Sequence, residues 1–167
     1  MSGRVTRFEQ SATQGPTTVD RIHTDEFDDA LADVLEGPAV GAPLPFEGVS
    51  LPQDVTRNPT PRELRDARIG VTPVGPAVAD LGSVVVRSGA EGAEQISLYP
   101  DTHVAVLAAS DIQPTIADAI TEIDARVASG LTSAVLATGP SGTGDMGSVV
   151  YGAHGPSSVH VIVLEDR

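Results

Sequence analysis

The chain has 167 residues, enough for one domain, and carries 23 acidic against 10 basic residues, for a net charge of −13. That charge repels nucleic-acid phosphates. Because the acidic residues are scattered, it predicts a protein adapted to high salt rather than one with an acidic tail for a basic partner. Without cysteine, the chain has no disulfide, thiolate zinc site or Cys-ligated iron–sulfur cluster. It shows neither a signal-peptide core nor a membrane-spanning apolar stretch, so we expect a cytoplasmic protein without membrane association.

The N-terminal third of the chain predicts short elements. Residues 1–16 are polar and predict a lead-in without regular structure, and residues 17–22 predict a first strand. Thr24 is suited to cap a helix, because apolar residues recur behind it with helical spacing as far as Leu35. Two short apolar pieces, residues 39–40 and 49–51, predict brief strands.

The rest of the chain alternates strands with helices. Thr60, Pro61 and Glu63 form a capping box that predicts a helix to about residue 68, and residues 111–129 carry an apolar stripe typical of a second helix. Apolar runs predict strands at residues 69–72, 82–87, 104–108, 132–137 and 159–164. Since these strands are apolar rather than alternating, we expect a single α/β domain, a three-layer α/β/α fold around a mostly parallel sheet.

A glycine-rich loop follows the strand at residues 132–137. It contains Gly139, Ser141, Gly142, Thr143, Gly144 and Asp145. Glycine lets a backbone approach a ligand closely, and consecutive N–H groups together with two hydroxyls are able to hold an anion. The alternative is a tight exposed turn whose glycines serve only a positive φ. Because loops at strand ends of open α/β sheets often form ligand crevices, we favour anion binding.

The same loop holds a formal dinucleotide-binding pattern. Gly142, Gly144 and Gly147 have the GxGxxG spacing, with Glu165 and Asp166 roughly twenty residues further on. Residues 148–158 contain Gly and Pro and leave no room for the crossover helix that such a site needs. We therefore do not expect a nucleotide site.

Polar groups elsewhere complete the candidate site. His154 is the candidate proton carrier or anion donor near neutral pH, and Asp145 is the second catalytic candidate. Gly82 and Ser83 stand at another strand end and are expected to face the same crevice. No Ser-His-Asp order or paired catalytic carboxylates are recognisable, so no reaction is assigned.

The other histidines are interpreted as structural. His160 lies inside the last strand and is expected to be packed there, and His103 and His23 stand alone as structural or surface groups. Their spacing, and that of Asp145, matches no metal-ligand set. Neither a metal nor a cofactor is predicted.

Six segments carry a family resemblance: residues 70–72, 79–86 (ADLGSVVV), 97–106, 138–146 (with GPSGTGDM from Gly139), 152–156 (GAHGP) and 159–164. In this order they resemble the LUD domain of the lactate-utilisation protein C family. The resemblance implies a fold like that of CoA transferases and sugar-phosphate isomerases. It also implies a role beside iron–sulfur proteins that oxidise lactate to pyruvate. Gly142 and Gly147 stand where many relatives have a basic and an acidic residue, and residues 1–60 are only loosely covered.

We therefore expect an accessory or ligand-binding subunit that acts with iron–sulfur oxidoreductase partners. Its crevice is expected at the carboxyl ends of the strands, where Gly82, Ser83, the 139–145 loop and His154 hold a small carboxylate or phosphate. The alternative is a stand-alone enzyme, CoA-transferase-like or sugar-phosphate isomerase-like. A third is an assembly protein without a ligand. No nucleic acid is expected to bind. The chain could form a homo-oligomer, and the sequence does not decide this.

Overall fold

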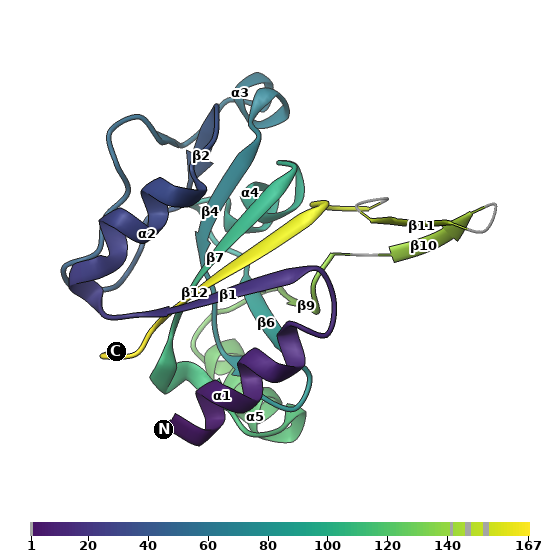
Figure 1. Ribbon diagram of the computed structural model, residues 1–167. Helices are drawn as coiled ribbons and strands as arrows, with labels where there is room; N and C mark the ends of the chain where they lie inside the picture. Colours follow the sequence, from purple (N-terminus) through teal and green to yellow (C-terminus); the bar gives the residue numbers. More distant parts are fainter. Residues whose placement is uncertain (1, 141, 146–147, 152–153) are drawn as a thin grey trace.

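The computed structural model describes residues 2–140, 142–145, 148–151 and 154–167. Its centre is a sheet of six parallel strands in the order β1-β12-β7-β4-β2-β3 (Figure 1). The strands are β1 (Thr17–Ile22), β2 (Ala39–Gly41), β3 (Thr56–Arg57), β4 (Ile69–Pro73), β7 (Thr102–Ala108) and β12 (Ser158–Leu164). The predicted α/β class with a mostly parallel sheet is therefore confirmed.

A second, four-stranded sheet has the order β8-β5-β6-β9. It consists of β5 (Ala77–Val78), β6 (Ser83–Arg87), β8 (Ile112–Gln113) and β9 (Ala134–Ala137), and β6 runs antiparallel to both β5 and β9. The assignment of residues 82–87 and 132–137 to the parallel sheet was wrong. An apolar run does not specify which strand it pairs with, and β9 is largely exposed although its run is apolar.

Helix α1 (Ser2–Ala12) occupies the region predicted to be a lead-in without structure. Val5, Phe8 and Ala12 are buried, which gives this otherwise polar helix one narrow apolar stripe. The prediction was wrong because three apolar residues in a polar segment are a weak signal. These three residues are sufficient to hold the helix because they pack into a hydrophobic cluster formed by the rest of the chain.

The three helices that were predicted lie close to their expected positions. A 3₁₀ turn, η1 (Thr24–Glu26), leads into α2 (Phe27–Val34), and α3 (Pro61–Asp66) has the expected capping box, in which the Glu63 N–H donates to Thr60 Oγ1 at 3.3 Å. Residues 49–51 form no strand. Helix α5 (Ile116–Ala128) begins five residues later than predicted, because Thr115 caps it and Ile112 pairs in β8 after the turn η2 (Ala109–Asp111).

The short helix α4 (Ala93–Leu98) packs directly against β4. A Cβ atom at Gly70 would lie 2.0 Å from the carbonyl oxygen of Ile96, so only glycine permits this distance between helix and strand. The position of α4 is thus fixed by one residue of the sheet.

Side chains of β7 alternate between two hydrophobic clusters. Val104 and Val106 join the cluster of α2, with Phe27 and Leu31, while Ala105 and Leu107 join the cluster that holds α1, α4 and β6. The parallel sheet is therefore covered on both faces, as its apolar strands indicated. Among the described helices, none is long and apolar enough to cross a membrane.

Candidate functional site

Three of the predicted site residues border one cavity of about 190 Å³. Gly82, Gly139 and His154 come from separate parts of the chain and meet there with Thr17 and His103. We call this space the amino-end cavity, because β1, β7 and β12 contribute residues at or next to their amino ends. These three residues were expected at the carboxyl ends of the strands, and they lie at the amino ends of the parallel strands instead. Gly139 follows the carboxyl end of β9, but β9 belongs to the second sheet, and that end meets the starts of the parallel strands.

The two glycines of the amino-end cavity are required by packing. Gly139 has φ +68°, and a Cβ atom there would lie 2.9 Å from Thr17 Oγ1. Gly82 has φ +63°, and its Cβ would lie 2.2 Å from the backbone nitrogen of Ala12 in α1. Their presence in the sequence therefore reflects local geometry as well as any approach of a ligand.

Ser83 does not line the cavity, because its side chain is fully buried next to it. Its Oγ lies 2.6 Å from Thr138 Oγ1, and the two hydroxyls share a hydrogen bond. Since Thr138 directly precedes Gly139, this bond between the start of β6 and the end of β9 fixes the loop. Ser83 is a positioning residue.

The cavity holds two histidines in different environments. His154 is exposed at the border, where it is free to contact a ligand. His103 is buried, its Nε2 lies 2.8 Å from Thr72 Oγ1, and burial lowers the pKa of His103 to about 4, so its ring is neutral at neutral pH. His103 was expected to be a structural or surface group, yet it lines the cavity, as do Thr17 and Ser97, which no sequence pattern had singled out. The available signal was that His103 and Ser97 lie in the 97–106 segment of the family resemblance.

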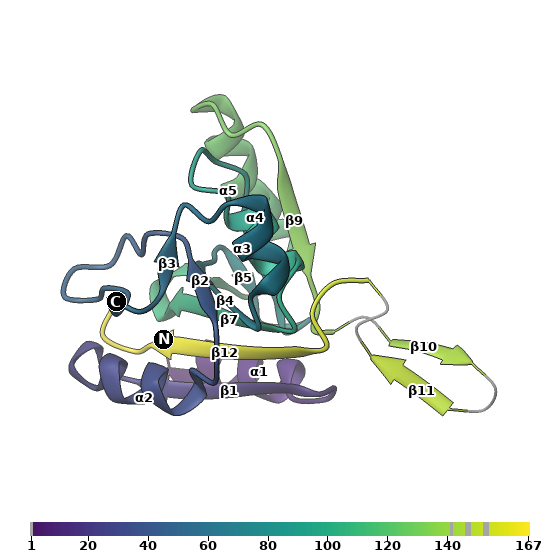
Figure 2. The ribbon, with the colours of Figure 1, turned by 90° about the horizontal axis from the view of Figure 1, so that it is seen from above.

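The predicted glycine-rich loop forms a hairpin instead. Gly142–Asp145 is strand β10, Ser148–Tyr151 is strand β11, and the pair projects from the body of the molecule (Figures 1 and 2). This path leads the backbone of Thr143, Gly144 and Asp145 away from the cavity, and Ser141 lies outside the described residues. The hairpin also stands where a dinucleotide-binding fold would have its crossover helix.

His160 is packed in its strand, as expected. It lies in β12, where its Nδ1 is 2.5 Å from Thr18 Oγ1 and its Nε2 is 3.1 Å from Asp20 Oδ2, both on β1. His23 is exposed before η1. Among the described residues, no three His, Asp or Glu side chains gather as a metal site.

The remaining described lining of the amino-end cavity is largely apolar, with Val84, Val86, Leu98, Val135, Ala137, Pro156, Val159 and Val161. None of the described lining residues is Arg, Asp or Glu. The charge of a bound anion would therefore be met by backbone N–H groups and by His154, while the apolar wall would contact its carbon atoms. Pockets for drug-sized ligands hold roughly 300–1,000 Å³, so this smaller cavity suits a compact molecule.

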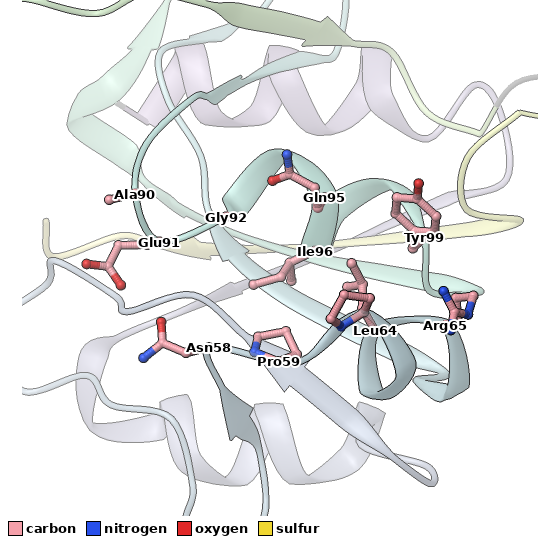
Figure 3. Close-up of a pocket in the computed structure, with 11 residues that line it drawn as sticks. Asn58, Pro59, Leu64, Arg65, Ala90, Glu91, Gly92, Gln95, Ile96 and Tyr99 are labelled. Atoms are coloured by element: carbon pink, nitrogen blue, oxygen red, sulfur yellow. The ribbon is translucent and has the colours of Figure 1, made fainter.

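A longer groove of about 420 Å³ runs between α3 and α4 (Figure 3). Leu64 and Ile96 lie along it, with Asn58 and Glu91 at one end and Arg65 and Tyr99 at the other. None of the predicted site residues lies here. Because its polar groups are spread along the groove, they do not converge on one small ligand.

The fold and the amino-end cavity define an α/β domain with a compact, mostly apolar ligand cavity. The model of the LUD domain family matches residues 7–164, so the chain belongs to the LUD domain family. The match covers the segments in which the sequence resemblance was stated.

The chain is similar to several bacterial proteins called Lactate utilization protein C. The one from Bacillus licheniformis is 36% identical over 105 residues, which are 60% of this chain and 44% of that protein. The one from Deinococcus radiodurans is 31% identical over 130 residues, 75% of this chain and 61% of that protein. The chain spans about half the length of the curated relatives it matches.

A solved structure has the same fold. It is a crystal structure of a DUF162 family protein from Deinococcus radiodurans, with a TM-score of 0.77, 23% sequence identity and coverage of 98% of both chains. This likeness extends over the N-terminal region that the sequence resemblance covered only loosely.

Proposed function

We propose that this protein is a ligand-binding subunit in the utilisation of lactate or a related organic acid, and that the amino-end cavity holds the acid. The observation that carries the proposal is the meeting of Gly82, Gly139 and His154 around a cavity of about 190 Å³. A three-carbon acid fits this size, with its methyl group against the apolar wall and its carboxylate towards His154 and the backbone of Gly139. The names of the relatives from Bacillus licheniformis and Deinococcus radiodurans support the choice of lactate.

The test is isothermal titration in molar salt with lactate, pyruvate, CoA esters and sugar phosphates. We expect heat with lactate or pyruvate and a loss of about tenfold in affinity in His154→Ala, the size of one lost hydrogen bond to a charged group. His23→Ala is the matched control, since that exposed histidine lies outside the cavity. No heat with any of these compounds, while the protein stays folded, contradicts the proposal. Turnover of a CoA ester or sugar phosphate without a partner would instead support the stand-alone enzyme.

The second part of the proposal is a partner that carries an iron–sulfur cluster. Oxidation of lactate to pyruvate releases two electrons, and a chain without cysteine has no Cys-ligated cluster to accept them. In this proposal the electrons pass to a cluster on a partner protein in the cytoplasm. Purification of the tagged chain from its own host should enrich an iron–sulfur oxidoreductase, and its absence at physiological salt would contradict this part alone.

A further inference from the structure

A third hollow, of about 460 Å³, lies at the end of the parallel sheet opposite the amino-end cavity. Ala42 follows the carboxyl end of β2 and Pro73 ends β4, and both line this space. Its charged lining residues are Arg87, Arg126 and Glu91. We call it the arginine pocket. Ligands of open α/β sheets commonly bind outside the carboxyl ends of the strands, which is where this pocket lies.

Arg87 brings a charge into the pocket from the end of β6. The β6 residues Val84 and Val86 join the core cluster, and the alternation of the strand places Arg87 with Val85 on the other face. The Arg87 side chain is half-buried, yet within the described part of the chain its guanidinium has no hydrogen bond or ion pair. Burial, and then the charge of Arg126, lowers the pKa of Arg87, while the nearby carboxylates of Asp111 and Glu122 act in the opposite direction. Neither carboxylate bonds Arg87 among the described residues, so its N–H donors remain available to a ligand in the pocket.

Arg126 is held at the pocket by hydrogen bonds that join α5 to β8. Its Nε donates to Glu122 Oε1 at 3.1 Å, its Nη2 donates to the same oxygen, and Gln113 Nε2 donates to Glu122 Oε2 at 2.9 Å. Both oxygens of Glu122 are thus occupied, and Glu122 does not bond Arg87. The Arg126 Nη1 group makes no hydrogen bond with other described residues and remains available to the pocket.

The wall next to Arg87 is held in place by reciprocal hydrogen bonds. The Ser88 N–H donates to the Ser133 carbonyl at 2.9 Å, and the Ser133 N–H donates to Ser88 Oγ at 3.0 Å. These bonds join the loop after β6 to the segment after α5. The two guanidiniums are therefore presented by a frame that exists before any ligand binds.

We propose that the arginine pocket binds a small oxyanion, a carboxylate or a phosphate, between Arg87 and Arg126. Guanidinium groups recognise planar carboxylates and phosphates through paired N–H donors, and a bound oxyanion would accept hydrogen bonds from the donors that Arg87 and Arg126 keep available. The site is separate from the amino-end cavity, so it stands whether or not that cavity binds an acid.

The test is titration of the whole chain with inorganic phosphate and, separately, with lactate, in Arg87→Gln and Arg62→Gln. Arg62 is exposed on α3, where its Nε lies 3.6 Å from Asp66 Oδ2, so Arg62→Gln removes the same charge from outside the pocket. We expect wild type and Arg62→Gln to bind at least one of the two anions. We expect Arg87→Gln to bind it at least about tenfold more weakly. Arg87→Lys keeps the charge but loses the paired N–H donors of the guanidinium, so its affinity should lie between those of wild type and Arg87→Gln.

The anion that gives heat identifies the source of the oxyanion, and thermal unfolding of each variant checks that the fold is kept. Equal affinity in Arg87→Gln and wild type overturns the proposal, as does the absence of heat with both anions. If His154→Ala abolishes lactate binding and Arg87→Gln does not, lactate belongs to the amino-end cavity. If Arg87→Gln abolishes it and His154→Ala does not, this inference holds and the proposed location of the acid fails.

Discussion

The glycines of the amino-end cavity illustrate how one residue serves two roles. Gly82 meets the backbone of α1, and Gly139 meets the hydroxyl of Thr17, and both have a positive φ. Each glycine therefore brings a separate segment to the border of the cavity while keeping the space of a side chain empty. Substitutions at these positions test the packing before they test any ligand.

Gly82→Ala should destabilise the protein by at least about 2 kcal/mol, since a Cβ there meets backbone atoms of Ala12 and the left-handed conformation costs alanine further free energy. Gly15→Ala is the control, because nothing lies within 4 Å of its Cβ position. Chemical denaturation of both variants gives the two losses of stability. Equal, small losses would show that α1 moves away from β6 at little cost.

His103 makes stability depend on pH. Its pKa is lowered by burial from 6.5 to about 4, so the unfolded chain takes up a proton at a higher pH than the native protein does. The free energy of unfolding is therefore unaffected by this group above pH 6.5, and it falls by up to about 3 kcal/mol as the pH approaches 4. His103→Gln should therefore lose less stability than wild type between pH 7 and pH 4.5 in denaturant titrations. Identical pH profiles would contradict the buried neutral ring.

At the scale of elements, α1 is the part of the fold that the sequence concealed most completely. Phe8 has no exposed surface, and with Val5 and Ala12 it fills the cluster that also contains β6 and β12. The helix therefore covers one face of the parallel sheet and meets Gly82 at its C-terminus.

Phe8→Ala should cost about 3–5 kcal/mol, the loss typical of a buried aromatic side chain. Phe46→Ala, at a partly buried phenylalanine against the other cluster, should cost less. Thermal and denaturant unfolding of both variants measure the difference. If Phe8→Ala lowers the free energy of unfolding no more than Phe46→Ala does, α1 does not contribute to the core.

The sequence was sufficient for elements whose signal is local. The capping box at Thr60 was predicted because its residues are close together in the sequence. Strands β4, β7 and β12 were predicted because a strand buried on both faces is a continuous apolar run. The partners of β6 and β9 were not, since pairing is decided by the whole topology. Gly82, Gly139 and His154 were expected to meet and do, whereas Arg87 and Arg126 lie far apart in the chain and no local pattern links them.

For the molecule as a whole, the net charge of −13 is the dominant electrostatic feature. Mutual repulsion of carboxylates opposes the compact state, and salt screens this repulsion over a length of about 10 Å at 0.1 M and less at higher concentration. The charge thus predicts a stability that rises with salt, whatever the ligand.

The melting temperature should rise as potassium chloride increases to molar concentrations. A double variant that neutralises two exposed carboxylates, Asp54→Asn with Glu36→Gln, should rise less steeply, because less repulsion is left to screen. Differential scanning calorimetry across a salt series measures both slopes. A melting temperature independent of salt, or two equal slopes, would contradict a role for the acidic surface.

Helix α4 is a wall common to all three hollows described above. Ala93 lines the arginine pocket, Gln95 and Ile96 line the groove of Figure 3, and Leu98 lines the amino-end cavity. The close contact at Gly70 holds α4 on β4, so the helix resists displacement by a ligand in any of these spaces. A ligand at one end of the sheet would alter the space at the other end through this helix only by displacing these six residues.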